Sequence, residues 1–287
     1  MESIQVKAYA KINLGLNVLG RRQDGYHEVR MLMQTIRLFD KLTVKMTQTA
    51  GITLKSNLSY LPCDDNNLIY RAAALFFEET KQRCGIHVTL EKHIPVAAGL
   101  AGGSSDAAAT LTALNELYHT GLSLEELKQL GIRLGADVPY CLMQGTALSE
   151  GIGERLTPLP APPPAYCLVV KPPVSVSTRY VYEHLNLSDA PHPDIDALLN
   201  ALNNKNLALI AANLGNTLES VTIPLHPEIA AIKAELLEAG ALGALMSGSG
   251  PTVFGLFSDR PKAEHAFYRF KVGEFGKQTY LTNFWNK

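Results

Sequence analysis

The sequence has almost no net charge and no long hydrophobic run. Its 287 residues include 26 lysines and arginines against 27 aspartates and glutamates, which leaves a formal net charge of −1. A chain this close to neutrality has no overall cationic field for a polyanion, so general nucleic-acid binding is disfavoured, although a local basic cleft is not excluded. No stretch approaches the run of about 18 apolar residues that indicates a membrane span. With 46% hydrophobic residues, the chain can nevertheless bury a core.

Cysteine and histidine are few and show no metal-binding pattern. No CxxC pair occurs, so a zinc site or a redox pair is poorly supported. The eight histidines lack the spacing of metal ligands, and HExxH and GxSxG motifs are absent, so no metal-ligating residue is expected. Because the N-terminus lacks the basic and apolar regions of a signal peptide, we expect a cytoplasmic protein with reduced thiols. The cysteines are Cys63, Cys84, Cys141 and Cys167.

Proline is concentrated in one place, which suggests a domain junction. At roughly 150 residues per domain, the length favours about two domains. Seven of the sixteen prolines lie between Pro158 and Pro173. Proline fixes φ and removes a backbone donor, so residues 158–164 are predicted to form a stiff, extended connection. We therefore expect an N-terminal domain over residues 1–157 and a C-terminal domain over residues 165–287.

Hydrophobic periodicity predicts strands and helices in both halves. Residues 4–18 alternate apolar and polar, which predicts a half-buried strand, and Asp24-Gly25 signals a turn after it. Ser123 and Glu126 have the spacing of a capping box. Further strands are expected over residues 29–47, 51–55, 87–95, 166–172, 252–257 and 279–285. Helices are expected over residues 67–81, 104–121, 123–134, 177–186, 194–202, 206–213, 227–239 and 261–274.

The most informative segment is the glycine-rich loop PVAAGLAGGSS, from Pro95 to Ser105. Glycine lets the backbone approach an anion closely and adopt positive φ. The helix expected to begin near Ser104 would supply unpaired N–H groups and the positive end of its dipole, so the segment suits phosphate binding. A plain glycine-rich turn is the alternative. A Walker A loop and a dinucleotide fingerprint are excluded, because no lysine follows the glycines and the GxGxxG spacing is absent.

Three polar residues elsewhere are candidates for chemistry. Lys11 and Asn13 project from the same face of the first strand. A lysine there could lower the pKa of a substrate hydroxyl or neutralise developing charge, or it could belong to a solvated strand face. Asp137 precedes Val138-Pro139, and the proline forces an extended Val138. Asp137 is therefore either a general base or a residue of the turn.

A second glycine loop and several aromatic residues complete the candidates. MSGSGPTVF, over residues 246–254, has glycines that allow close approach to a ligand or simply form a tight turn. Tyr26 and His27 follow the Asp24-Gly25 turn and offer an aromatic face and a hydrogen-bonding ring. Tyr182 could stack on a base, or pack in the core.

Three segments occur together and in order: AKINLGLNVLGRRQDGYHEV, PVAAGLAGGSSDAAA and MSGSGPTVFGLF. Together they resemble the GHMP small-molecule kinases, over nearly the whole chain from Lys7 to about Phe257. The middle loop is typical of the ATP site of that superfamily. The first segment, with GADVP, resembles the branch that phosphorylates a 2-hydroxyl on an alcohol carrying a cytidine diphosphate group, in the non-mevalonate route to isoprenoids.

The resemblance implies an α+β fold of two domains. The N-terminal domain would be a ribosomal-protein-like βαβ domain with a left-handed crossover, which is rare. The C-terminal domain would be a ferredoxin-like α/β domain, and the active site would lie in the cleft between the two.

The resemblance also implies catalytic and nucleotide-binding roles. Asp137 would take the proton from the 2-hydroxyl, and Lys11 would hold Asp137 and the hydroxyl in place. Asn67 and Lys92 are further candidates for nucleotide contact. The loop residues that would wrap the ATP phosphates are Pro95, Val96, Ala97, Ala98, Gly99, Leu100, Ala101, Gly102, Gly103, Ser104 and Ser105.

Substrate contacts follow in the same way. Asn13, Tyr26 and His27 would bind the diphosphocytidyl group, with His27 reading the cytosine edge and Tyr182 stacking on the other face of the base. Gly248 to Gly250 would close around the phosphates. Mg²⁺ would bind chiefly to ATP oxygens, since no carboxylate cluster is dedicated to it, with Ser105 or Asp106 as candidate ligands.

One departure from the family pattern is visible. Family loops often read GLGGGSS, whereas Ala101 replaces the middle glycine here. A methyl group is tolerable at that position only if Ala101 keeps φ negative.

Three alternatives stay open: a related GHMP kinase acting on another alcohol, a non-catalytic nucleotide-binding protein, and an RNA-binding module, against which the net charge weighs. We expect a monomer or weak homodimer with a small-molecule substrate, no nucleic acid and no membrane.

Overall fold

The structure, a computed structural model, describes residues 2–82 and 85–286, so Cys84 lies outside the described residues. The chain divides into two compact units. Neither is one continuous stretch, because the long strands β1 (Ser3–Arg21) and β2 (His27–Thr47) contribute residues to both. This division differs from the predicted proline boundary, which remains a prediction. Unit 1 comprises Met1–Ala10, Leu38–Val96 and Ala101–Gln144, and unit 2 comprises Lys11–Arg37, Ala97–Leu100 and Gly145–Lys287.

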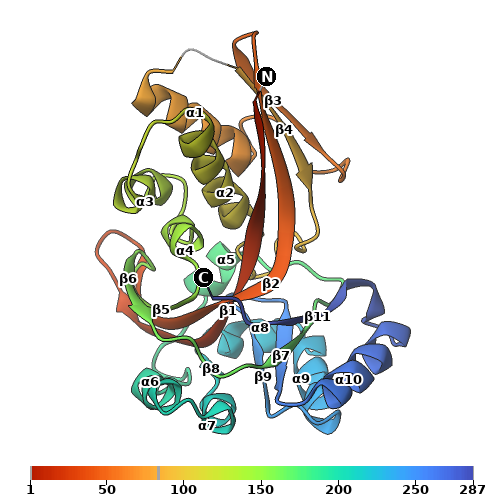
Figure 1. Ribbon diagram of the computed structural model, residues 1–287. Coiled ribbons are helices and arrows are strands. Elements are labelled where there is room, and N and C mark those ends of the chain that lie inside the picture. The colour runs from red at the N-terminus through yellow and green to blue at the C-terminus, as the bar shows by residue number, and fades with distance from the viewer. Residues whose placement is uncertain (1, 83–84, 287) are drawn as a thin grey trace. The chain divides into compact units, whose positions relative to one another are not determined.

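Unit 1 combines a small sheet with a helical layer. The far end of β2, Lys41–Thr47, pairs antiparallel with β4 (Gly85–Glu91), which pairs in parallel with β3 (Gly51–Ser56). Helix α1 (Leu68–Thr80) packs on β3 and on α2 (Gly102–Leu117) (Figure 1). The apolar residues of α2 are buried over most of its length, which makes α2 the centre of this unit.

Local capping explains where the helices of unit 1 begin. Helices α3 (Leu124–Ile132) and α4 (Val138–Met143) pack against each other and on α2. The side chain of Asn67 accepts a backbone hydrogen bond as the N-cap of α1. Ser123 and Glu126 form the predicted capping box at the start of α3. The residue types at these positions therefore set the helix starts.

Unit 2 contains two groups of strands. The first half of β2 pairs antiparallel with β5 (Thr146–Gly151), which pairs with β6 (Arg155–Leu159). Strand β1 pairs in parallel with the short β8 (Gly215–Asn216). The second group is an antiparallel sheet in the order β11-β7-β10-β9. Its strands are β7 (Tyr166–Val170), β9 (Gly243–Met246), β10 (Val253–Phe257) and β11 (Thr279–Asn283).

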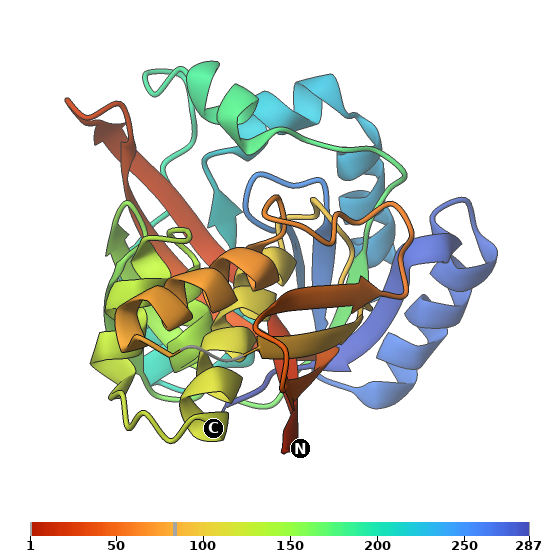
Figure 2. The ribbon, with the colours of Figure 1, turned by 90° about the horizontal axis from the view of Figure 1, so that it is seen from above.

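Helices of unit 2 pack on this antiparallel sheet and lie beside the second glycine loop, residues 246–254. Helix α9 (Glu228–Glu238) packs on β9 and β10, and α10 (Arg260–Val272) packs on β7 and β11. Figure 2 shows the blue helix α10 beside the sheet. All five residues of β10 are buried, so this sheet carries the core of the unit. The remaining helices are α5 (Thr178–Glu183), α6 (Ile195–Asn203), α7 (Leu207–Ala212), α8 (Glu219–Leu225) and a 3₁₀ turn over Gly276–Gln278.

Most predicted elements are present, and the α+β class of the two-domain fold is confirmed. The prediction was wrong at several ends: β4 stops at Glu91 instead of Pro95, and α2 begins at Gly102 and ends at Leu117. Helix α4 was not predicted, and the expectation of an extended Val138 was wrong, because Val138 is the first residue of this helix. A proline in the first helical turn suits a helix start. Pro158 lies inside strand β6, so the proline-rich segment is only partly a connection. Strands β5, β6, β8 and β9 and helix α8 were also not predicted.

The free thiols of unit 1 and unit 2 include Cys63, Cys141 and Cys167. Among the residues that the structure describes, no helix combines the length and hydropathy that crossing a membrane requires.

Candidate active site

The glycine-rich loop adopts an alternating backbone conformation. Ala97, Gly99 and Ala101 have φ of 50°, 72° and 55°, whereas Ala98 and Leu100 between them are not in the positive-φ region. Alternation of this kind turns successive N–H groups toward one side, as in the backbone nests that bind anions. The expectation that Ala101 keeps φ negative was therefore wrong, because the nest requires a left-handed residue directly before α2.

The two glycine loops singled out in the sequence contact each other within unit 2. The Ser247 hydroxyl donates to the Gly99 carbonyl oxygen at 3.0 Å. A Cβ placed on Gly99 would lie 2.1 Å from the Ser247 carbonyl oxygen, and one on Gly248 would lie 3.1 Å from the Gly99 carbonyl oxygen. A side chain at Gly99 would clash with the second loop, and one at Gly248 would be crowded at a φ of 59°, so glycine suits both positions.

Lys11 lies beside both loops. Its backbone N–H donates to the Leu100 carbonyl at 3.1 Å, and its Nζ lies 3.6 Å from the position of a Cβ on Gly248. The Nζ atom also donates to Asn13 Oδ1 at 2.8 Å, which confirms that the two side chains share a face. Both residues are buried, so the interpretation of a solvated strand face is wrong. Lys11 thus brings a cation to the nest.

Asp137 belongs to unit 1, at the position before α4, and is partly exposed. Its side chain makes no capping hydrogen bond to that helix. A capping role is therefore not what its carboxylate performs. Because Lys11 belongs to unit 2, the pairing expected between Lys11 and Asp137 remains a prediction.

Two predicted base-binding residues lie together in unit 2. The rings of His27, at the start of β2, and Tyr182, on α5, have centroids 5.0 Å apart and planes inclined by 35°. Burial, with a smaller contribution from the charge of Arg21, holds the pKa of His27 below its usual 6.5. The ring is therefore neutral at pH 7 and offers one donor and one acceptor nitrogen. Tyr26 next to it is exposed.

Side chains that the sequence did not reveal hold the second glycine loop. The buried Asn216 amide donates to the carbonyl oxygens of Met246 and Gly248, each at 2.8 Å. The Thr178 hydroxyl lies 2.8 Å from that of Ser249, which links the start of α5 to the loop. The only signal for Asn216 was a polar residue directly after a glycine, and this pattern is too common to indicate a role.

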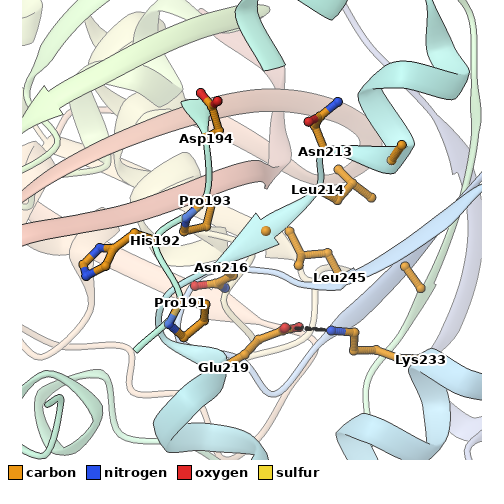
Figure 3. A pocket seen from close by; sticks show the side chains of 13 residues that line it. Pro191, His192, Pro193, Asp194, Asn213, Leu214, Asn216, Glu219, Lys233 and Leu245 are labelled. Atoms are coloured by element: carbon orange, nitrogen blue, oxygen red, sulfur yellow. Dashed lines mark hydrogen bonds and ion pairs between the residues drawn. The ribbon is translucent and has the colours of Figure 1, made fainter. Parts of the chain in front are cut away.

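A cavity of about 410 Å³ opens beside Asn216 in unit 2. Glu219 and Lys233 form an ion pair at 2.7 Å on its wall (Figure 3). Glu219 also accepts the backbone N–H of Met246 at 3.0 Å. The polar residues on this wall therefore hold the strand that leads into the second glycine loop.

The two outlying candidates for nucleotide contact have other partners. Asn67 caps α1 through its oxygen and donates its amide to the Pro62 carbonyl at 2.8 Å. Lys92 is buried, and its Nζ contacts Asp40 at 2.5 Å and Asp106 at 2.6 Å. Neither aspartate was recognised in the sequence as a partner of Lys92. An acidic residue within the apolar segment RLFDKLTV and another beside a run of alanines were the signals available.

The residues near the loop do not fit a protein-held Mg²⁺. Ser105 donates its hydroxyl to the Tyr9 carbonyl at 2.7 Å, and Asp106 Oδ2 contacts the Lys92 ammonium. Asp106 Oδ1 is buried without a hydrogen-bond partner, but a dication there would lie next to that ammonium. Within the described ranges, no group of three or more His, Cys, Asp or Glu could hold a metal ion. No catalytic step is therefore assigned to a metal ion held by these side chains.

Two family models match this chain, one on each side of the proline-rich segment. The GHMP kinases N terminal domain matches residues 67–145, and the GHMP kinases C terminal domain matches residues 187–272. The first match contains the nest and Asp137, and the second contains Asn216 and the Gly248 loop.

Curated relatives match over nearly the full length. A 4-diphosphocytidyl-2-C-methyl-D-erythritol kinase from Lachnoclostridium phytofermentans is 59% identical over 285 residues, covering 99% of this chain and 98% of the relative. One of the same name from Exiguobacterium sibiricum is 48% identical, covering 92% and 93%.

Solved structures give the same picture. A crystal structure of 4-(cytidine 5'-diphospho)-2C-methyl-D-erythritol kinase superposes with a TM-score of 0.85 at 36% identity, covering 99% of this chain and all of the other. Homoserine kinase from Cytophaga hutchinsonii, with a TM-score of 0.79, 22% identity and coverage of 99% and 94%, shares the fold.

Proposed function

The chain belongs to the GHMP kinase family, and from this membership we propose that it is an ATP-dependent kinase that phosphorylates the 2-hydroxyl of 4-diphosphocytidyl-2-C-methyl-D-erythritol, in the non-mevalonate route to isoprenoid precursors. The observation that carries this proposal is the contact between two glycine loops around a backbone nest, with Lys11 beside it. A nest and a buried cation suit a triphosphate, and relatives that are similar over nearly their whole length carry the name of that kinase.

The phosphates of ATP would bind to the N–H groups of residues 97–103 and to the start of α2. Phosphoryl transfer asks a protein mainly for positioning and charge stabilisation, and these groups supply both. Lys11 would neutralise charge that develops on the transferred group, with Asn13 fixing the orientation of its ammonium. Ser247 and Gly248 would hold the nest in place from the second loop.

Asp137 would act as the general base for the 2-hydroxyl. Its side chain makes no capping hydrogen bond to α4, and Lys11 would bring the hydroxyl into line. The inference that the two meet in a cleft between the domains is part of this proposal.

The cytosine ring would bind between His27 and Tyr182. The two ring centroids are 5.0 Å apart, and rotation of the side chains can separate the rings enough to admit a flat base. The neutral His27 ring can accept a hydrogen bond from the exocyclic amine of cytosine. Tyr26 would cover the exposed side of this pocket, and Asn13 would hold the diphosphate end.

Finer properties belong to the same proposal. Mg²⁺ would enter with ATP, bound to phosphate oxygens, and would neutralise part of their charge. The proposal includes a ribosomal-protein-like domain over residues 1–157 and a ferredoxin-like domain over residues 165–287. It also includes a cytoplasmic location, no nucleic-acid partner, and a monomer or weak homodimer.

The test is a kinase assay with ATP, Mg²⁺ and the diphosphocytidyl alcohol, run beside mevalonate, homoserine and the alcohol without its cytidyl group. We expect ADP release and a phosphorylated product with the first substrate alone. Turnover of another alcohol at equal efficiency would refute the cytidyl specificity, and ATP binding without turnover of any alcohol would identify a non-catalytic nucleotide-binding protein.

A further inference from the structure

We propose that Lys92 is a positioning residue for the phosphate loop, acting through Asp40 and Asp106 and never touching the nucleotide. This inference rests on the proposed ATP site and deepens it. Lys92 then does not contact the nucleotide directly. Asp40, Lys92 and Asp106 form a buried ionic clamp that fixes both ends of the segment containing the loop.

The clamp holds the entrance of the loop through Asp40. One oxygen of this carboxylate accepts the backbone N–H groups of His93 at 2.5 Å and Ile94 at 2.8 Å, and the other accepts the Lys92 ammonium at 2.5 Å. Asp40 lies on β2 and is fully buried, so it is a fixed point on the sheet. The chain is thereby fixed immediately before the loop starts.

The clamp holds the exit of the loop through Asp106. This residue lies in the first turns of α2, and its Oδ2 accepts the same ammonium at 2.6 Å. A Cβ on Gly102 would lie 2.9 Å from Lys92 Nζ and 3.0 Å from Ile94 Cγ2, so the ammonium packs directly beneath the first residue of the helix. One cation therefore sets the distance between residues 94 and 102.

Direct contact with a nucleotide is disfavoured by the same geometry. The Lys92 side chain is 3% exposed, and both of its partners are buried carboxyl groups. A phosphate would have to displace a buried carboxylate from the ammonium, which would leave that carboxylate without its partner in a low-dielectric site. Lys92 therefore transmits its effect through backbone geometry.

Charge balance gives Asp106 a distinct role. Burial raises the pKa of Asp106 well above 3.8, with the charge of Lys92 opposing and that of Asp40 reinforcing the shift. Burial alone would lower the pKa of Lys92, but the two carboxylates raise it above 10.5. Two carboxylates and one ammonium would leave a net charge of −1 in the buried clamp, and a proton on Asp106 would balance it. A neutral amide at position 106 should therefore serve as well as the acid.

The first experiment compares Lys92→Met with Val88→Ala, a truncation of a fully buried side chain on β4, four residues before Lys92. ATP affinity is measured by calorimetry, and KM by kinase assay, at a temperature where both variants are folded. We expect Lys92→Met to lower kcat/KM for ATP about 10²-fold, because a displaced loop misplaces the phosphates, with the KM of the alcohol within about twofold of wild type. An equal loss of ATP affinity in Val88→Ala would reduce Lys92 to a general stabilising role and overturn the proposal.

The second experiment uses Asp106, which keeps the test valid if Lys92→Met does not fold. The Asp106→Asn side chain is uncharged and keeps an oxygen that can accept a hydrogen bond from Lys92. We therefore expect ATP affinity within about threefold of wild type. Asp106→Leu removes the exit anchor, and we expect the loss seen in Lys92→Met. Unchanged ATP affinity in Asp106→Leu would show that the contact between Asp106 and Lys92 does not position the loop, and would overturn the clamp.

Failure of the proposed function has a different signature. Calorimetry with ATP does not depend on the acceptor, so a wild-type chain that binds ATP without phosphorylating the cytidyl alcohol would refute the substrate alone. The clamp would then be judged on the ATP affinities of the variants. A wild-type chain that binds no ATP would overturn both.

Discussion

Ala101 adopts a backbone conformation that residues with a side chain rarely take. Its φ of 55° and ψ of 30° are left-handed, at a cost of roughly 1–2 kcal/mol for an L-residue. Ala101→Gly relieves that strain and loses part of the gain to the greater freedom of the unfolded chain. We expect the free energy of unfolding to rise by about 0.5–1 kcal/mol in denaturant titration.

Ala98→Gly is the matched control for Ala101→Gly. Ala98 lies in the same loop outside the positive-φ region, and its methyl group is buried. The substitution there has no strain to relieve, so stability should fall. Equal destabilisation by the two substitutions would contradict the strain at Ala101.

Asp137 is expected to act on the chemical step alone. Base catalysis contributes about 10²–10⁴-fold, so Asp137→Asn should lower kcat by that factor. Asparagine keeps the size of the aspartate side chain and an acceptor oxygen, so the melting temperature should stay close to that of wild type, and ATP affinity should too. Steady-state kinetics and calorimetry measure the three quantities, and undiminished turnover in the folded variant would remove Asp137 as the base.

His27 is expected to make substrate binding sensitive to acid. Folding lowers the pKa of His27 from 6.5, so the folded state binds fewer protons than the unfolded state near that pH. The contribution of His27 to stability is therefore present above 6.5 and is lost as the pH falls through the lowered pKa. The same protonation removes the acceptor nitrogen that would meet cytosine. We expect the KM of the alcohol to rise as the pH falls from about 8 to about 5, and the KM of ATP serves as the internal control.

Arg21 offers an independent check on the His27 titration. Its charge lowers the pKa of His27, so Arg21→Gln should move the rise in KM to higher pH. A profile that is unchanged in His27→Asn would assign the titration to another group.

At the scale of elements, the contact between the two glycine loops determines the shape of the nest. Gly99→Ala would place a Cβ 2.1 Å from the Ser247 carbonyl oxygen, at a φ of 72°. The loops must separate, so we expect stability to fall by more than the roughly 1–2 kcal/mol of left-handed strain, and ATP binding to be lost. Denaturant titration and calorimetry give the two quantities.

Gly121→Ala isolates the strain from the clash. Gly121 has a φ of 69°, and nothing lies within 4 Å of a Cβ placed there. The variant should lose stability by the strain alone and keep its affinity for ATP. If Gly99→Ala behaved in the same way, the contact of the loops would have no part in nucleotide binding.

At the scale of the whole molecule, the sequence predicted what depends on local pattern. The strand alternation around Lys11 and Asn13, the capping box at Ser123 and the glycine-rich loop before α2 follow from the residues themselves, and the structure contains all three. The family resemblance supplied the fold class and the kinase assignment, which full-length relatives support.

Contacts between distant segments could not be predicted in this way. Asp40 and Asp106 are 66 residues apart and both contact Lys92, and Asn216 reaches a loop some thirty residues away. Periodicity reports which face of an element is buried, but not which element covers it. The positive φ of Ala101 was missed for a related reason, because the nest fixes its conformation and the residue type opposes it.

Binding of ATP should stabilise the whole chain by mass action. At a hundredfold excess over Kd the native state gains about 2.7 kcal/mol, which for a chain of this size corresponds to a rise of roughly 5–10 °C in the melting temperature. Asp137→Asn should show the same rise, since it alters only the chemistry, whereas Gly99→Ala should show none. Differential scanning calorimetry with the non-hydrolysable ATP analogue measures all three. A full rise in Gly99→Ala would mean that the nucleotide is held elsewhere, whatever the turnover of the variants.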